Sequence, residues 1–320
     1  MDLQTLAKNH KPTVLHLEVT SICNLSCPQC DRESPELFDK SLQTELSLQR
    51  CKELFDEDFI RGLNKVYMCG DFGDPCAAKD TLEIFEYFRQ VNPKIYLGLN
   101  TNGSVKSVEW WSKLGKLFNK PYDYVEFGID GLEDTNHIYR KTAKWNKIIN
   151  NATAFIKEGG YAHWSFLVFK HNEHQIDEAR DLAKKLGFSW FYTKVSNRFK
   201  SKPVDFLDPP TGFKENTQEP SSIDCYVLKE QSIYVNSQGK ILPCCWFGRH
   251  SYISPLARAL ASGGPINNEL QWYLNDWTRI SNSWLTDKPA KICLETCGVV
   301  DNDSTLFKNM WTQKIELTNL

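Results

Sequence analysis

The sequence predicts an α/β fold in which an open, partial (β/α)6 barrel precedes a small C-terminal domain made of a β-hairpin and a helix. Two observations support this prediction: the alternation of strand and helix patterns along the chain, and the number of strands. Between residues 14 and 195, short apolar runs alternate with amphipathic stretches, as in successive βα units. Six strands joined by helices form a parallel sheet with right-handed crossovers. Six strands are too few to close an eight-stranded barrel, so we expect an open one.

The strand predictions rest on short runs rich in β-branched, leucine and aromatic residues, at 14–19, 65–69, 95–100, 124–129, 163–169 and 189–195. Helical periodicity fills the intervals, at 43–59, from 80 onward, and at 107–118, 145–158 and 174–186. Asp80 and Glu83 have the spacing of a capping box, and Gly187 is a helix stop signal.

A change in composition divides the chain into two predicted domains. Residues 201–222 contain Lys-Pro, Asp-Pro-Pro and Glu-Pro pairs, which are typical of an irregular linker. We therefore assign residues 1–200 to the barrel and residues 223–320 to the small domain. In the latter, apolar segments at 231–235 and 240–242 flank Asn-Ser-Gln-Gly, which predicts a hairpin.

Charge and apolar content restrict the function classes. Lysine and arginine number 38 against 40 acidic residues, a net charge of -2, which argues against nucleic acid or an anionic membrane as a partner. No signal peptide or membrane-spanning run is recognisable, so we expect a cytoplasmic protein.

The eleven cysteines indicate metal or redox chemistry, because disulfides are disfavoured in the cytosol. Seven of them fall into two spaced sets, one near each end of the chain. Cys51, Cys69 and Cys76 stand apart, and we expect them to be small buried hydrophobic residues. Cys245 is ambiguous.

The first set follows the first predicted strand and has the spacing Cys23-x3-Cys27-x2-Cys30. Three thiolates on one short loop can hold three irons of a [4Fe–4S] cubane and leave the fourth iron open for catalysis. The alternative is a structural zinc site. Zinc sites favour paired C-x2-C units with four ligands in total, a pattern that fits this loop poorly.

Further motifs stand at the ends of the next three strands, where the chemistry of such barrels lies. They are Gly73-Asp74-Pro75 after the second strand, Thr101-Asn102-Gly103 after the third, and Gly128-Ile129-Asp130-Gly131 after the fourth, followed by Arg140. Together with the cysteine loop, these motifs make residues 14–195 resemble the radical S-adenosylmethionine (SAM) superfamily. The resemblance implies that SAM binds the open iron and is cleaved to a 5′-deoxyadenosyl radical.

The same resemblance assigns cofactor-binding positions. Gln29 stands where the family usually has an aromatic residue, whose contact to adenine is often through the backbone. Gly73 and Asp74 match the Gly-Gly-Glu-Pro motif that binds the SAM ammonium group. Asn102 belongs to the family's Thr-Asn-Gly element, and Gly128 replaces a serine that often touches the ribose. Arg140 matches an arginine that pairs with the SAM carboxylate, for which a planar guanidinium is well suited.

The second cysteine set comprises Cys225, Cys244, Cys293 and Cys297, enough to saturate a second [4Fe–4S] cluster. The pattern of this set resembles the twitch domain, the short form of the SPASM extension of radical SAM enzymes. It consists of one cysteine, a Gly-x4-Cys hairpin and a distant pair of cysteines. The resemblance implies one auxiliary cluster. Zinc also suits four cysteines, and Cys245 could replace Cys244, although the Gly239-x4-Cys244 spacing favours Cys244.

Our hypothesis from the sequence is a radical SAM enzyme that oxidatively modifies a peptide or protein, because full thiolate ligation of an auxiliary cluster favours electron transfer. The alternative within the family is dehydrogenation of a small molecule such as a cyclitol or sugar alcohol. A less favoured one is a zinc-bound, non-catalytic scaffold. An external electron donor such as flavodoxin or ferredoxin is implied. The sequence does not identify a general base among candidates such as Asp71, Lys194 and Asp224.

Overall fold

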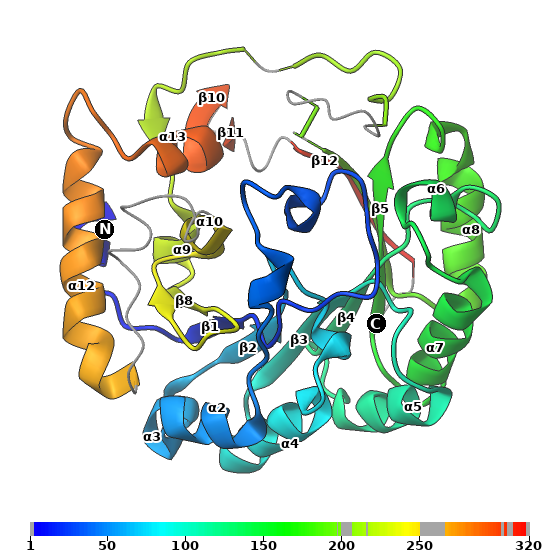
Figure 1. Cartoon of the computed structure of the whole chain (residues 1–320), viewed down its shortest axis with the longest axis horizontal. Helices are drawn as coiled ribbons and strands as arrows, with labels where there is room; N and C mark the ends of the chain where they lie inside the picture. The colour runs from blue at the N-terminus through cyan, green and yellow to red at the C-terminus, as the bar shows by residue number, and fades with distance from the viewer. Residues whose placement is uncertain are drawn as a thin grey trace.

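The computed structural model describes residues 3–196, 198–199, 207–215, 217–249, 266–301, 304–305 and 310–317. Its main feature is a nine-stranded sheet with the order β12-β6-β5-β4-β3-β2-β1-β8-β9. Strands β1 to β6 are neighbours in chain order and run parallel. The sheet curves but does not close, with helices along its outer face (Figure 1). The predicted α/β fold with an open partial barrel is therefore confirmed.

All six predicted strands are present close to their predicted bounds. They are β1 (Val14–Leu17), β2 (Lys65–Met68), β3 (Tyr96–Thr101), β4 (Tyr124–Gly128), β5 (Ala162–Val168) and β6 (Trp190–Val195). Since the strands are parallel and adjacent, their carboxyl ends lie along one edge of the sheet, and the loops that follow them are brought together there.

The helices pack their apolar faces on the outer side of the sheet. They are α2 (Leu48–Leu54), α3 (Glu57–Gly62), α4 (Thr81–Val91), α5 (Val108–Leu117), α7 (Trp145–Lys157) and α8 (Ile176–Leu186). The short helix α6 (Asn136–Tyr139) instead lies after β4, where Tyr139 packs with Leu25 and Cys27 of the cysteine loop. Large buried aromatic side chains fill the layer between these helices and the sheet, among them Phe85, Trp111, Phe127 and Phe155.

Two local predictions about the helices were wrong. The single helix expected at 43–59 is two helices, because Asp56 accepts a hydrogen bond from the amide of Phe59 at 2.8 Å and starts a new one. The expected capping box at Asp80 does not form, since its carboxylate instead accepts a hydrogen bond from the amide of Leu48 at 2.9 Å. A tertiary contact therefore replaces the local one.

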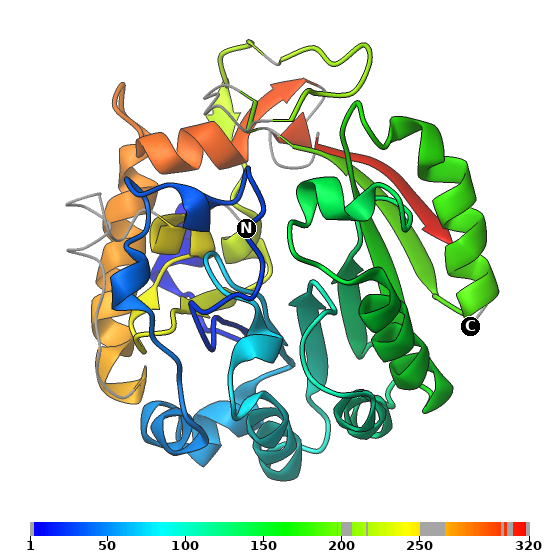
Figure 2. The ribbon, with the colours of Figure 1, turned by 45° about the vertical axis from the view of Figure 1, so that its right-hand side comes forward.

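Strands from the C-terminal region extend both edges of the sheet. β8 (Ser232–Val235) and β9 (Ile241–Leu242) form the predicted antiparallel hairpin, and β8 pairs in parallel with β1. At the other edge, β12 (Trp311–Glu316), red in Figure 2, is antiparallel to β6. The assignment of residues 1–200 and 223–320 to separate domains stays a prediction, and part of the predicted linker at 201–222 lies outside the described residues.

The remaining elements surround the second cysteine set. A three-stranded sheet has the order β11-β10-β7, and α1 packs against α12. The bounds are α1 (Leu3–Lys8), β7 (Ser222–Ile223), α9 (Tyr226–Lys229), α10 (Cys245–Arg249), α12 (Ile266–Ser283), α13 (Lys291–Cys297), β10 (Gly298–Asp301) and β11 (Ser304–Thr305). None of the helices in the described part of the chain combines the length and apolar character that a membrane crossing requires.

Candidate active site at the carboxyl ends of the strands

A cavity of about 240 Å³ lies at the carboxyl ends of the parallel strands. Its walls come from the cysteine loop after β1 and from the loops that follow β2, β3 and β4. The predicted site residues that line it are Cys23, Cys27, Cys30, Gly73, Asp74, Asn102, Gly128 and Arg140. The fold thus brings together residues that are up to 117 positions apart in the sequence. Among the predicted cofactor-binding residues, Gln29 alone does not line the cavity.

The three cysteines of the first loop face this cavity from a largely apolar wall. Leu25 and Cys27 belong to a buried cluster with Tyr139 and Phe169. Burial raises the pKa of Cys23 to about 11 and that of Cys27 to about 12. A bound cation is therefore needed to hold these side chains as thiolates at neutral pH.

The donor set fits an iron–sulfur cubane. No group of three or more His, Cys, Asp or Glu side chains within the described ranges is arranged around a single metal ion. Cysteines that ligate a cubane each reach a different iron, so they need not converge on one point. The three cysteines line the same cavity as the polar side chains of Asn102 and Arg140.

Asp74 joins the loop after β2 to the loop after β3. Its carboxylate accepts hydrogen bonds from the hydroxyl of Thr101 at 2.9 Å and from the amides of Asn102 and Cys76 at 2.7 and 2.9 Å. These bonds use most of the acceptor capacity of the carboxylate. Gly73 is required by a close backbone approach, because a Cβ there would clash with the carbonyl oxygen of Thr20.

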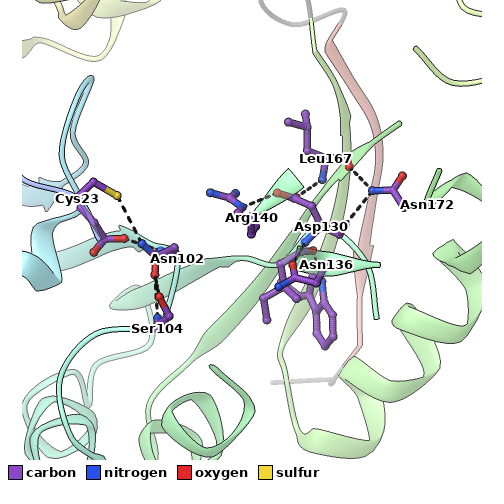
Figure 3. Close-up of polar contacts among 11 residues, drawn as sticks. Cys23, Asn102, Ser104, Asp130, Asn136, Arg140, Leu167 and Asn172 are labelled. Carbon is purple, nitrogen blue, oxygen red and sulfur yellow. Dashed lines mark hydrogen bonds and ion pairs between the residues drawn. The ribbon is translucent and has the colours of Figure 1, made fainter. Parts of the chain in front are cut away.

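The side chain of Asn102 is fixed on the same side of the cavity (Figure 3). Its Nδ2 donates to Oδ1 of Asn24 at 3.0 Å and to Sγ of Cys23 at 3.8 Å. Its Oδ1 accepts from the amide of Ser104 at 2.8 Å. The predicted Thr-Asn-Gly element therefore contacts the cysteine loop directly.

Arg140 lies across the cavity from Asn102, with its guanidinium extending from Asp130 toward the side where Cys23 lies (Figure 3). Its Nε is 2.6 Å from Oδ2 of Asp130. Burial acts to lower the pKa of Arg140, but the negative charge of Asp130 keeps this pKa above its ordinary value. Gly128 makes room for this arrangement, since a Cβ there would clash with Nη2 of Arg140.

Gln29 is bound to a neighbouring arginine instead of facing the cavity. The backbone carbonyl oxygen of Gln29 accepts a hydrogen bond from Nη1 of Arg198 at 3.0 Å. The next residues form a charged anchor for the cysteine loop. Asp31 lies 2.9 Å from Nη2 of Arg198 and 2.6 Å from Nε of Arg249, the last residue of α10. The backbone contact expected between Gln29 and adenine stays a prediction.

Several residues that line the cavity were not predicted from the sequence, among them Cys69, Glu126 and Ser165. Cys51 and Cys76 are fully buried as expected, but Cys69 is half-buried and faces the cavity. Its position directly after a barrel strand is the signal that could have identified it. Asp71, one of the candidate bases, also lines the cavity, and burial raises its pKa well above its ordinary value.

The other two candidate bases differ in position. Lys194 is the last residue but one of β6. Burial lowers its pKa, and the nearby charge of Glu126 offsets this only in part. Asp224 instead forms an ion pair with Lys229. Lys194 is thus near the cavity wall, whereas Asp224 belongs to the second cysteine region.

The cysteines of the second set approach one another between β7, α9, α10 and α13. The amide of Asp224 donates to the carbonyl of Cys297 at 2.9 Å, which places Cys225 beside α13. Burial, and then the neighbouring Cys225, raises the pKa of Cys293 to about 12.

The two adjacent cysteines Cys244 and Cys245 have different surroundings. Burial is the main cause of the raised pKa of both. The charged neighbours that also raise the pKa of Cys244 are Cys245, Cys293 and Cys225, whereas those of Cys245 are Asp71, Cys69 and Cys297. Cys244 therefore lies near two other cysteines of the set, and Cys245 lies between the cavity residues Asp71 and Cys69 and the set member Cys297.

An open parallel barrel with a cysteine-lined cavity at its strand ends defines a class of cofactor-dependent enzymes. The model of the Radical SAM superfamily matches residues 17–183, more than half of the chain, and the chain belongs to this family. The matched range contains β2 to β5, the last residue of β1 and every predicted residue of the first site.

Curated relatives are similar over part of their length. The mycofactocin maturase MftC of Mycolicibacterium smegmatis is 27% identical over 187 residues, which are 58% of this chain and 45% of that protein. The PqqA peptide cyclase of Bradyrhizobium diazoefficiens is 24% identical over 272 residues, 73% of this chain and 66% of that protein. The chain thus spans about half to two thirds of the length of these relatives.

Solved structures share the fold. The crystal structure of anSMEcpe with bound AdoMet and the Cp18Cys peptide superposes with a TM-score of 0.60 at 16% identity, over 93% of this chain and 91% of that one. At this identity the likeness concerns the fold alone.

Proposed function

We propose that this radical SAM enzyme binds a [4Fe–4S] cluster through Cys23, Cys27 and Cys30, cleaves SAM reductively, and oxidatively modifies a peptide or protein. The cavity that contains all three cysteines together with Arg140 carries the proposal. When bound, the cluster would supply the electron that breaks the S–C5′ bond of SAM. The loop has three thiols for four irons, so one iron is left for SAM.

The protein side chains would bind and orient SAM. Arg140 uses Nε for Asp130, and its remaining N–H groups are available for the SAM carboxylate. Asp74 has little free acceptor capacity, so we assign it mainly to holding Asn102 and Thr101 in place. The apolar cluster around Cys27 would exclude water, which protects a reactive radical.

The substrate would enter between the two cysteine sets. Cys69, Asp71 and Glu126 form the cavity wall away from the first loop, and Cys245 faces the same wall. Cys225, Cys244, Cys293 and Cys297 would hold an auxiliary [4Fe–4S] cluster behind it. An electron lost by an oxidised substrate would then have a nearby acceptor.

The peptide substrate class is supported by the relatives. The names of MftC and the PqqA cyclase describe a maturase and a peptide cyclase, and anSMEcpe was crystallised with a peptide. A small cyclitol or sugar alcohol is the second substrate class.

Anaerobic reconstitution tests the proposal. We expect about eight irons and eight sulfides per chain and release of 5′-deoxyadenosine on reduction with dithionite. The matched variants are Cys23→Ala, which should abolish release, and Cys51→Ala, which removes a fully buried cysteine outside both sets. Stoichiometric zinc without iron would contradict the proposal.

Substrate class is tested on the reconstituted protein with candidate peptides and cyclitols. A peptide that loses about two hydrogens in mass spectrometry, with 5′-deoxyadenosine formed in step, supports peptide oxidation. Turnover of a cyclitol and of no peptide would assign the enzyme to small-molecule dehydrogenation instead.

A further inference from the structure

A second cavity lies outside the proposed SAM site. It is an open groove of about 770 Å³ at the amino-terminal ends of α5 and α7. Three lysines and one glutamate are among its lining residues: Lys106, Lys144, Lys147 and Glu133. Trp145 and His137 also line it, and we call this surface the lysine groove. No function considered so far uses it.

The groove is locally basic in a protein that is acidic overall. Lys144 and Lys147 are exposed, while the net charge of the chain is -2. The amino-terminal end of α7 adds partial positive charge, because Lys144 at its N-cap makes no side-chain capping bond and the first turn has no acidic residue. Glu133 and the exposed His137 complete the polar rim.

The lysine groove and the cysteine cavity share two loops. In the loop after β3, Asn102 lines the cavity and Lys106 lines the groove. In the loop after α6, Arg140 lines the cavity and Lys144 lines the groove. The same two short segments therefore form walls of both spaces.

Both loops also hold the cysteine loop itself. Nδ2 of Asn24 donates to Oγ of Ser104 at 2.9 Å, and Oγ1 of Thr142 donates to the carbonyl of Asn24 at 3.2 Å. Ala143, which lines the groove, packs against the apolar cluster that contains Cys27. A macromolecule bound in the groove would thus contact the segments that directly cover the first cysteine loop.

From this arrangement we infer that the lysine groove is the docking surface for an acidic one-electron carrier protein that reduces the cluster on Cys23, Cys27 and Cys30. The inference rests on the proposed function, which requires one electron per SAM cleaved. Charge complementarity selects the partner, because the lysines of the groove attract an acidic carrier to this face of a chain whose net charge is negative. Electron-transfer encounters are small and transient, so a groove of this size is sufficient.

The test uses full-length protein with flavodoxin as the acidic carrier. The groove variant is Lys144→Glu with Lys147→Glu. The control is Lys184→Glu with Lys185→Glu, an equal charge change at exposed positions at the far end of α8. Acidic residues at the amino-terminal end of α7 favour the helix, so misfolding does not explain a loss of binding by the groove variant. Thermal melts of both variants verify this.

Binding is measured directly at low and high salt. We expect the groove variant to raise the Kd for flavodoxin at least tenfold at low salt, the control to change it less than about twofold, and added salt to reduce the difference. Carbodiimide cross-linking, which joins lysine to carboxylate, should modify Lys144 or Lys147. An unchanged Kd in the groove variant, or cross-links only at other lysines, would overturn the inference. So would displacement of flavodoxin by inorganic phosphate, which would mark a small-anion site.

Chemical reduction separates this inference from the proposed function. With dithionite, the groove variant should form 5′-deoxyadenosine at the wild-type rate, whereas with reduced flavodoxin the rate should fall. If wild-type protein forms none with dithionite, the proposed function fails. Equal rates of both proteins with flavodoxin would contradict the docking surface alone.

Discussion

Arg140 is held by Asp130 through an ion pair with an Nε to Oδ2 distance of 2.6 Å. Asp130 is itself fixed, because its Oδ1 accepts a hydrogen bond from the amide of Leu167 at 2.6 Å and its amide donates to Oδ1 of Asn136 at 2.9 Å (Figure 3). The aspartate thus transmits the positions of β5 and α6 to the guanidinium. The guanidinium of Arg140 can extend into the cavity because Asp130 fixes its Nε.

Replacing Asp130 by Asn tests this relationship. The variant leaves Arg140 without its charged partner, so we expect SAM affinity to fall by about tenfold or more and the free energy of unfolding to fall by about 3 kcal/mol. Equilibrium binding of SAM and denaturant unfolding measure the two effects separately.

The control for Asp130 is a second buried ion pair far from the cavity, between Arg89 and Asp123 at 2.7 Å. Asp123→Asn should lower stability to a similar extent and leave SAM affinity unchanged. Equal SAM affinity in both variants would show that Asp130 has a structural effect only.

Substitutions of the two adjacent cysteines, Cys244 and Cys245, are predicted to have different effects on the iron content. Cys244 lies near two cysteines of the set, Cys225 and Cys293, whereas Cys245 lies near Asp71 and Cys69 of the cavity and near one cysteine of the set, Cys297. We expect Cys244→Ala to lower the iron content from about eight to about four per chain, and Cys245→Ala to keep about eight. Iron and sulfide assays with electron paramagnetic resonance provide the measurement. Loss of the auxiliary signal in Cys245→Ala alone would reverse the assignment.

Gly73 is predicted to be indispensable for packing. An added methyl would be forced against the carbonyl of Thr20, so Gly73→Ala should destabilise the protein by about 1–3 kcal/mol in denaturant unfolding. Gly62 is the matched control, since a Cβ there meets no atom within 4 Å. Gly62→Ala should change stability by less than about 1 kcal/mol. Similar effects of the two substitutions would contradict the close approach at Gly73.

Acidification is predicted to destabilise the fold through histidines inside it. Burial lowers the pKa of His10, His16 and His163 from 6.5 to about 4. The unfolded chain then binds more protons than the folded one between these values. The stability that these three histidines contribute is therefore fully present above pH 6.5 and is lost as the pH is lowered toward 4.

Unfolding midpoints measured from pH 7 to pH 4 check this expectation. His163→Gln should flatten the profile, because one of the buried titrating groups is removed. His174→Gln, at an exposed position, should leave the slope unchanged. Identical profiles of the wild type and His163→Gln would show that the fold does not hold His163 neutral.

Short-range patterns were sufficient for the six strands and for the first cysteine loop. Strand character and thiol spacing are local properties, and the order of parallel strands follows from the handedness of their connections. Local signals failed where a distant partner competed. Asp80 has a capping sequence, yet its carboxylate binds the amide of Leu48, which is 32 residues away.

Patterns of neighbouring residues predicted the α/β barrel, the three cysteines after β1 and the motifs at the strand ends. Three features are evident in the folded chain alone: the different neighbours of Cys244 and Cys245, the ion pair between Arg140 and Asp130, and the groove that Lys106 and Lys144 share. These facts depend on side-chain directions and on the packing of loops that join different strands. Spacing along the chain carries no information about them.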